Sequence, residues 1–176
     1  METLVAAHRL LPFNTWLKVT NLQNEESVNV RVIDRGPFVN GRILDLSKAA
    51  ARQIGLLGPG IGRVRLEVIA APADIPTNDF YAVQVGAFAV YENAERARER
   101  YAQRFGTASI AEKRGARPMW RVLVGKQPSV DAARQLADQL KGEDKNVFVV
   151  RLDETPPNLA APPAASLAPV PPTPQP

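Results

Sequence analysis

The sequence predicts two small domains, a mainly β domain followed by an α+β domain. Two observations carry this prediction. Apolar and polar residues alternate over short segments between residues 17 and 69, and a period of two is typical of half-buried strands. Residues 79–152 instead repeat a strand–helix–strand pattern, which favours a four-stranded sheet with both helices on one face.

The first domain is predicted over residues 1–70. Its expected elements are a hairpin of strands at 17–22 and 27–33, a short strand at 43–46, a helix at 48–54 and a closing strand at 64–69. Ser47 is a suitable N-cap for the helix, and Gly55 is a suitable stop signal.

The second domain is predicted over residues 79–152, after a proline-containing linker at 71–78. Its expected elements are strands at 80–88, 107–112, 118–125 and 146–152 and helices at 92–104 and 130–140. Residues 153–176 are rich in Pro and Ala. Such a composition cannot build a core, so this segment is predicted to be a disordered tail.

Composition limits the classes of function. The 176 residues carry a net charge of +4 and contain no cysteine, which excludes disulfides, thiolate metal sites and a lipid-modified cysteine within the printed residues. No block of like charges indicates an arm for nucleic acid. No apolar run is long enough to span a bilayer, and no signal peptide is recognised at the start. We therefore expect no membrane insertion by these residues.

The segment Val-Arg-Val-Ile-Asp-Arg-Gly-Pro-Phe at residues 30–38 is the strongest candidate for a functional site. The predicted strand has to end after Asp34, because Gly36 accepts unusual backbone angles and Pro37 cannot donate a hydrogen bond to a neighbouring strand. A carboxylate at the end of a strand is well placed for chemistry. The alternative is that Asp34 only caps its own turn.

Several short motifs, in one order and with close spacing, resemble a known family. Residues 6–13, 19–22, 32–38 and 45–47 resemble the double-psi β-barrel domain of the rare lipoprotein A family, the septal endolytic lytic transglycosylases. Residues 81–88 and 120–125 resemble the SPOR (sporulation-related repeat) domain. The resemblance covers residues 1–152. It implies a six-stranded-type double-psi β-barrel followed by an α+β, RNP-like SPOR domain.

The resemblance also implies an activity. Lytic transglycosylases cleave peptidoglycan glycan strands without water and leave anhydro-muramic ends, and SPOR domains bind glycan strands that lack stem peptides. Asp34 and His8 match the family's active-site aspartate and histidine. Because His8 is the one histidine of the chain, it cannot belong to a multi-histidine metal site. We expect no metal and no cofactor.

One family feature is not found. The family carries a further acidic residue in an Ala-Ser-Gly-Glu stretch upstream of its histidine, and the seven residues before His8 do not contain it. We therefore expect a barrel without its first strand, as a misplaced start, a gene fragment or a trimmed chain would give. Such a barrel is expected to be less stable than its relatives. The alternative function is a non-catalytic peptidoglycan-binding or expansin-like wall protein.

The second domain offers candidates for glycan contact, which are Gln84, Phe88, Trp120 and Arg121. Aromatic rings stack on sugars, and Gln and Arg bond to hydroxyl and acetamido groups. The alternative places Phe88 and Trp120 against the helices as core. A third interpretation, an RNA-binding sheet, lacks the paired aromatic residues expected on the central strands.

The remaining expectations concern the basic residues near the groove, the localisation of the protein and its partners. Arg35 and Lys18 are further candidates for contacts in the groove, or belong to a solvated basic surface. The resemblance implies that the full-length protein is periplasmic or an outer-membrane lipoprotein at the division septum. Division-site proteins are then expected partners.

Overall fold

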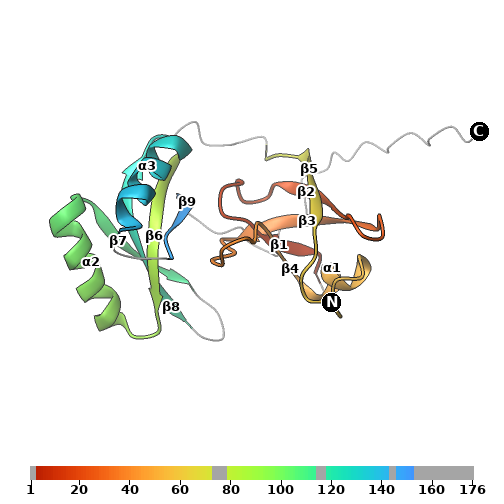
Figure 1. The fold of residues 1–176 in the computed structure, drawn as a ribbon, viewed down its shortest axis with the longest axis horizontal. Coiled ribbons are helices and arrows are strands. Elements are labelled where there is room, and N and C mark those ends of the chain that lie inside the picture. Colours follow the sequence, from red (N-terminus) through yellow and green to blue (C-terminus); the bar gives the residue numbers. More distant parts are fainter. Residues whose placement is uncertain (1–2, 73–78, 114–117, 143–145, 153–176) are drawn as a thin grey trace, which may run out of the picture.

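The computed structural model describes residues 3–72, 79–113, 118–142 and 146–152 (Figure 1). Most of the predicted linker at 71–78 and the whole predicted tail at 153–176 lie outside these residues. The two predicted domains are both present, and each has its own sheet.

The first domain is built on a five-stranded sheet with the order β4-β1-β3-β2-β5. Its elements are β1 (Val5–Ala7), β2 (Trp16–Asn21), β3 (Ser27–Asp34), β4 (Asp45–Leu46), α1 (Lys48–Gln53) and β5 (Val64–Ala70). The predicted hairpin is formed by β2 and β3, which pair antiparallel. The strand β1, which the sequence did not predict, runs parallel to β3 and antiparallel to β4.

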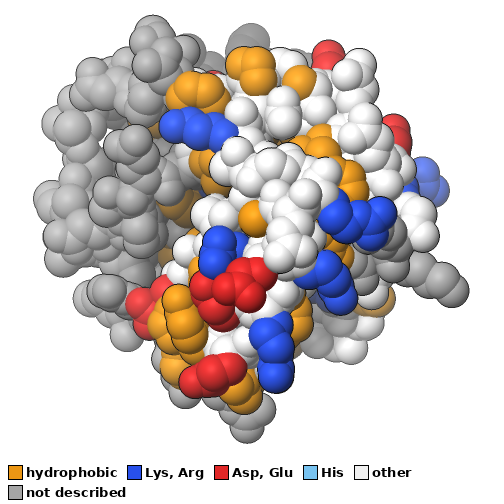
Figure 2. All heavy atoms as spheres, turned by 90° about the vertical axis from the view of Figure 1, so that its left-hand side faces the viewer, with side chains coloured by type: hydrophobic (Ala, Val, Ile, Leu, Met, Phe, Trp, Pro, Cys, Tyr) orange, Lys and Arg blue, Asp and Glu red, His pale blue; other side chains and the backbone are white. Residues whose placement is uncertain are grey.

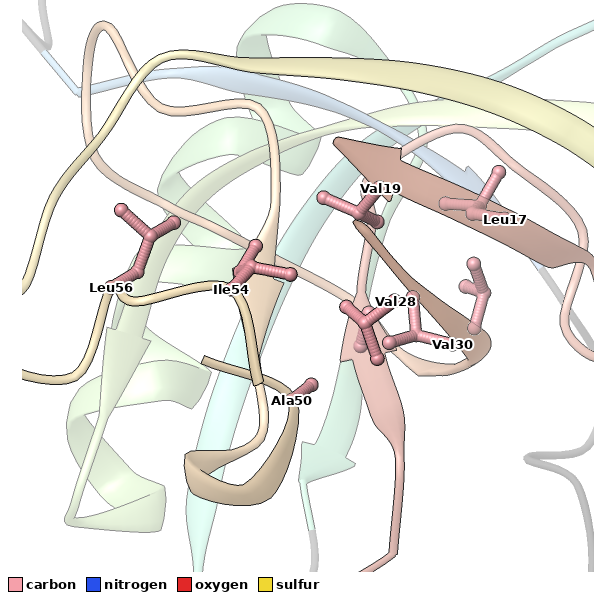
Figure 3. Close-up of a cluster of buried hydrophobic side chains, with 9 residues drawn as sticks. Leu17, Val19, Val28, Val30, Ala50, Ile54 and Leu56 are labelled. Atoms are coloured by element: carbon pink, nitrogen blue, oxygen red, sulfur yellow. The ribbon is translucent and has the colours of Figure 1, made fainter. Parts of the chain in front are cut away.

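The core of the first domain follows from the alternation in the hairpin (Figure 3). Leu17, Val19, Val28 and Val30 point inward and are buried, with α1 and the segment after it closing the cluster through Ala50, Ile54 and Leu56. The predicted N-cap of α1 is confirmed, because the Ser47 hydroxyl accepts a hydrogen bond from Ala50 N at 3.3 Å. Burial of these apolar side chains is the main stabilising term of the domain.

The second domain is a four-stranded antiparallel sheet with the order β7-β8-β6-β9. Its elements are β6 (Phe80–Phe88), α2 (Tyr91–Phe105), β7 (Ala108–Lys113), β8 (Met119–Gln127), α3 (Val130–Leu140) and β9 (Phe148–Leu152). Both helices pack on one face, around Val83, Val122 and Val124. The predicted layer arrangement is therefore confirmed.

The opposite face of this sheet, called the open face below, carries Ala82, Gln84, Arg121, Leu123 and Val150. It is turned toward the first domain, because Phe38 of that domain packs against Ala82, Leu123 and Val150. In Figure 1 β9 lies nearest the first domain and α2 lies farthest from it. The name refers to the absence of helices from this face and not to its exposure.

The outer end of the second domain is a solvated helical surface. Figure 2 shows Lys and Arg side chains interspersed with Asp and Glu side chains on it. On α2, for example, Arg98 Nη2 lies 2.6 Å from Glu95 Oε1. None of the helices in the described ranges combines the length and the apolar character needed to cross a membrane.

Candidate functional site

Asp34 ends β3, as predicted, and its two carboxylate oxygens face different partners. Oδ1 accepts a hydrogen bond from Arg35 N at 2.7 Å, which is the local turn contact that the sequence left open. Oδ2 lies 2.8 Å from Lys113 Nζ in the second domain, and the side chain is 44% exposed. Gly36 then takes a φ of +146°, a conformation that disfavours any residue with a Cβ. The turn therefore holds the carboxylate at the end of the sheet.

His8 follows β1 and lies beside Asp34. The residue pair Ala7 and Asp34 is in register across the parallel strands, and His8 N donates to Asp34 O at 3.1 Å. Two residues that are 26 positions apart are thus adjacent because of the short strand β1. The structure brings together the two catalytic candidates of the first domain.

The ring of His8 is held in one orientation. Its Nδ1 accepts hydrogen bonds from Leu10 N at 3.1 Å and from Leu11 N at 3.0 Å. Burial, with the positive charges of Arg35 and Arg9, lowers the pKa of His8 to about 4. The imidazole is therefore neutral near pH 7, and these bonds assign its proton to Nε2. In this state the Nε2–H group of His8 is available to donate a hydrogen bond.

Arg35 is a buried clamp behind the site, which neither sequence-based interpretation anticipated. It is 4% exposed. Its Nη1 donates to His8 O and to Leu11 O, both at 2.9 Å, and its guanidinium lies 3.8 Å from the centre of the Phe13 ring. Burial lowers the pKa of Arg35 to about 9, with Arg151 and Arg121 adding repulsion and Asp34 opposing it. The residue fixes the turn that carries His8.

The glycan candidates of the second domain lie on two different faces. Gln84 and Arg121 lie on the open face, where Gln84 pairs in register with Leu123 and is 4% exposed. Phe88 and Trp120 pack, partly buried, against the core on the helix side. Phe88 and Trp120 therefore belong to the core beneath the helices, which was the alternative to glycan contact. Of the four candidates, only Gln84 and Arg121 share the open face.

Trp120 has an aromatic partner on the helix side. Its ring meets that of Tyr91 edge to face, with centroids 5.0 Å apart and planes at 81°. Lys18, the remaining candidate, lies on β2 opposite Asn29 and Glu67, and among the described residues it makes no contact with Asp34 or His8. It is half-buried on the sheet.

A cavity of about 660 Å³ lies in the first domain but does not include Asp34 or His8. Residues from three regions line it: Leu22; residues 41–46 and 51; Leu56 and residues 60–64. Within it, Arg42 and Asp45 form an ion pair with each other. In the described part of the chain, no group of three or more His, Cys, Asp or Glu side chains is placed to hold a metal ion. Asp34 and His8 remain the candidate catalytic residues of the first domain.

Comparison with known families agrees with this division of the chain. Residues 1–66 match the family model described as lytic transglycolase, and residues 77–151 match the model of the SPOR domain. Together with the two sheets, these matches define a class of protein, a double-psi β-barrel of the lytic transglycosylase type followed by an RNP-like SPOR domain.

Individual relatives give the same result, and three are each called endolytic peptidoglycan transglycosylase RlpA. The protein of Campylobacter jejuni is 38% identical over 174 residues, covering 85% of this chain and 62% of the relative. That of Vibrio cholerae is 35% identical over 150 residues (80% and 56%), and that of Pasteurella multocida is 62% identical over 64 residues (36% and 22%). The chain belongs to this family, the rare lipoprotein A family. It spans at most 62% of the length of these relatives.

Proposed function

We propose that this protein is a peptidoglycan lytic transglycosylase that cleaves glycan strands within the periplasm. The observation that carries the proposal is the pairing of Asp34 with His8 at one end of a barrel that matches the lytic transglycolase model. The names of the relatives support the same reaction.

The reaction needs one acidic group near the glycosidic oxygen. In a lytic cleavage the leaving sugar takes a proton, a hydroxyl of the muramic residue attacks its own anomeric carbon, and an anhydro ring forms while that hydroxyl loses its proton. Asp34 can serve in two ways. It can deliver and later accept the proton, or it can remain charged and stabilise the positive charge that develops at the anomeric carbon.

His8 and Arg35 take supporting roles in this proposal. The neutral imidazole donates a hydrogen bond from Nε2 to the sugar, because Nδ1 is already bonded to Leu10 N and Leu11 N. Arg35 is a positioning residue, since it holds the carbonyl groups of His8 and Leu11. No step of the reaction requires a metal ion.

The second domain supplies substrate binding in this proposal. Gln84 and Arg121 offer amide and guanidinium groups for the hydroxyl and acetamido groups of a glycan strand without stem peptides. Enrichment of such strands where the wall divides would direct the protein to the septum. Contacts with other division proteins would then act at the same place.

The test is digestion of purified peptide-free glycan strands by the whole chain, with mass spectrometry of the products. We expect anhydro-muramic ends for the unmodified protein and a loss of at least 100-fold for Asp34→Asn. Asp131→Asn is the matched control, because Asp131 is an exposed carboxylate on α3, and it should leave the rate unchanged.

The same assay separates the alternative function. Binding of the strands with no anhydro products would support a non-catalytic peptidoglycan-binding or expansin-like protein. A failure to bind the strands at all would contradict both proposals for the second domain.

A further inference from the structure

The open face of the second sheet is covered by the rim of the first domain's site. We propose that this contact is a docked state in which the two domains mask each other's site, and that glycan strands compete with the first domain for the open face. The inference rests on the proposed function, because it concerns the regulation of the same two sites.

Apolar packing forms the centre of the contact. Phe38, four residues after Asp34, packs against Ala82, Leu123 and Val150. Its ring also meets that of Phe148 edge to face, with centroids 5.9 Å apart and planes at 65°. The loop that follows the carboxylate of the site therefore occupies the middle of the open face.

Backbone and cation contacts extend the docked surface along β9. Arg151 N donates to Arg9 O at 3.0 Å, so a strand of the second domain is hydrogen-bonded to the residue after His8. The guanidinium of Arg9 lies 5.4 Å from the centre of the Phe148 ring. The contact between the domains thus includes Arg9, which is next to His8, and Phe38, which follows Asp34 in the chain.

The ion pair of Asp34 with Lys113 opposes both roles proposed for the carboxylate. The ammonium group of Lys113 lies 2.8 Å from Oδ2, where it blocks the approach of a glycosidic oxygen that would take a proton from Asp34. If Asp34 instead stabilises positive charge on the sugar, the ammonium group already neutralises it and occupies the same space. The docked state is therefore an inactive state under either mechanism.

The open face loses hydrogen bonds in the docked state. Gln84 is 4% exposed, and its Oε1 has no hydrogen-bond partner among the described residues. Arg121 Nε is buried and is likewise without a hydrogen-bond partner in the described part of the chain. Burying an unsatisfied polar group is unfavourable. A glycan bound to this face offers hydroxyl and acetamido groups that can satisfy both atoms.

Like charges across the contact also oppose docking. Arg35 of the first domain lies close enough to Arg151 and Arg121 of the second for their positive charges to add to the effect of burial, which is the main cause of its lowered pKa. Asp34 offsets part of this repulsion, and Asp79 does so for Arg151, whose Nη1 lies 2.7 Å from Asp79 Oδ2. The remaining repulsion weakens the docked state, so a ligand that binds the open face can shift the equilibrium.

The two events are linked in both directions. A glycan strand on the open face displaces Phe38 and separates Lys113 from Asp34, which frees the carboxylate. By the same equilibrium, a substrate bound to the first domain raises the affinity of the open face for a strand. Cleavage is then confined to places where the second domain has already found its ligand.

The test uses a carbodiimide, which joins a carboxylate to an amine only when the two are in contact. The carbodiimide adds to the carboxyl group of Asp34 to form an O-acylisourea, and the Lys113 amine then displaces a substituted urea and forms an amide. Peptide mass spectrometry of the whole chain then detects the cross-link. Lys141 and Asp138 lie 2.7 Å apart on α3, and their cross-link serves as an internal control.

We expect the Asp34–Lys113 cross-link in the free protein and a decrease of about tenfold at saturating peptide-free glycan, while the Asp138–Lys141 cross-link stays constant. Lys113→Gln should also bind glycan strands about three- to tenfold more tightly, since it weakens the docked state. Lys141→Gln, the matched control, should leave the affinity unchanged.

Two outcomes would overturn the inference. One is the absence of the Asp34–Lys113 cross-link while the control cross-link forms, and the other is a cross-link that saturating glycan does not reduce. Failure of the proposed reaction is recognised separately. In that case the cross-links behave as expected, but no anhydro ends form from the unmodified protein.

Discussion

The site of the first domain and the open face of the second domain both contain buried polar groups, but these groups differ in the hydrogen-bond partners that the protein gives them. Around His8, Arg35 bonds to two backbone carbonyls and Nδ1 accepts from two backbone amides. On the open face, Gln84 Oε1 and Arg121 Nε are buried without a hydrogen-bond partner among the described residues. At the first site the imidazole and the two carbonyl groups are held by protein hydrogen bonds without a ligand, whereas Gln84 Oε1 and Arg121 Nε would gain partners from a bound ligand.

The largest effect should come from removing the clamp. Arg35→Ala leaves the carbonyls of His8 and Leu11 without their buried donor, and we expect a loss of about 3 kcal/mol in the free energy of unfolding. Arg35→Lys should recover less than half, because an ammonium group does not reproduce the planar fork. Denaturant unfolding of the first domain measures both. Arg65→Ala, at an exposed position, is the control, and an equal effect there would contradict the role of Arg35.

Substitution of Trp120 tests whether this residue belongs to the core or contacts the glycan. Trp120→Ala should cost about 2 kcal/mol of stability, because a partly buried ring that packs on the helix side and against Tyr91 is lost. Its affinity for glycan strands, measured under conditions where the variant is folded, should change less than twofold. The comparison variant is Arg121→Met, which removes a proposed glycan contact and should weaken binding. An equal loss of binding in Trp120→Ala would show that Trp120 contacts the glycan.

His8 should make stability dependent on pH. The folded-state pKa of about 4 lies below the ordinary value of 6.5, so the unfolded chain binds a proton first as the pH falls. Stability is then fully present above about pH 6.5 and is lost between there and pH 4, by about 1–2 kcal/mol after allowing for partial exposure. Unfolding curves across this range provide the measurement. In His8→Gln this part of the dependence should disappear, and its persistence would assign it to other groups.

The smallest expected effect is an increase in stability, whereas the preceding variants and conditions decrease it. Gln84→Leu replaces an unsatisfied buried amide by an apolar side chain of similar size, so we expect an increase of up to about 1 kcal/mol in the stability of the docked chain. Affinity for glycan strands should fall in the same variant. Gln135→Leu, at an exposed position on α3, should change stability by less than about 0.5 kcal/mol. A destabilised Gln84→Leu would contradict the comparison.

Local patterns in the sequence predicted most of the helices and strands, but they did not always predict which face of a sheet a side chain occupies. Alternation located β2, β3 and β6, and Ser47 correctly marked the start of α1. Phe88 reached the helix face because the register of β6 shifts between Gln84 and Gly86, and one extra residue moves every following side chain to the other face. Trp120 and Arg121 are neighbours on one strand, so a single face could never present both.

The remaining differences depend on contacts that are distant in the sequence. β1 has only three residues, too few for a periodic signal, and its parallel partner is 26 positions away. Arg35 belongs to a residue type that is almost never fully buried unless paired, so no local pattern indicates a clamp. The site pair itself, Asp34 and His8, came from the family motifs and not from periodicity.

The bond from His8 N to Asp34 O at 3.1 Å makes one amide proton a reporter on the assembly of the site. β1 is short and borders on the two-residue strand β4, so its opening should require less free energy than the opening of β3. Hydrogen exchange at the His8 amide then measures how often the catalytic candidates separate while the remaining core stays folded. We therefore expect the lifetime of the intact site to follow the opening of this three-residue strand and not the global stability of the domain.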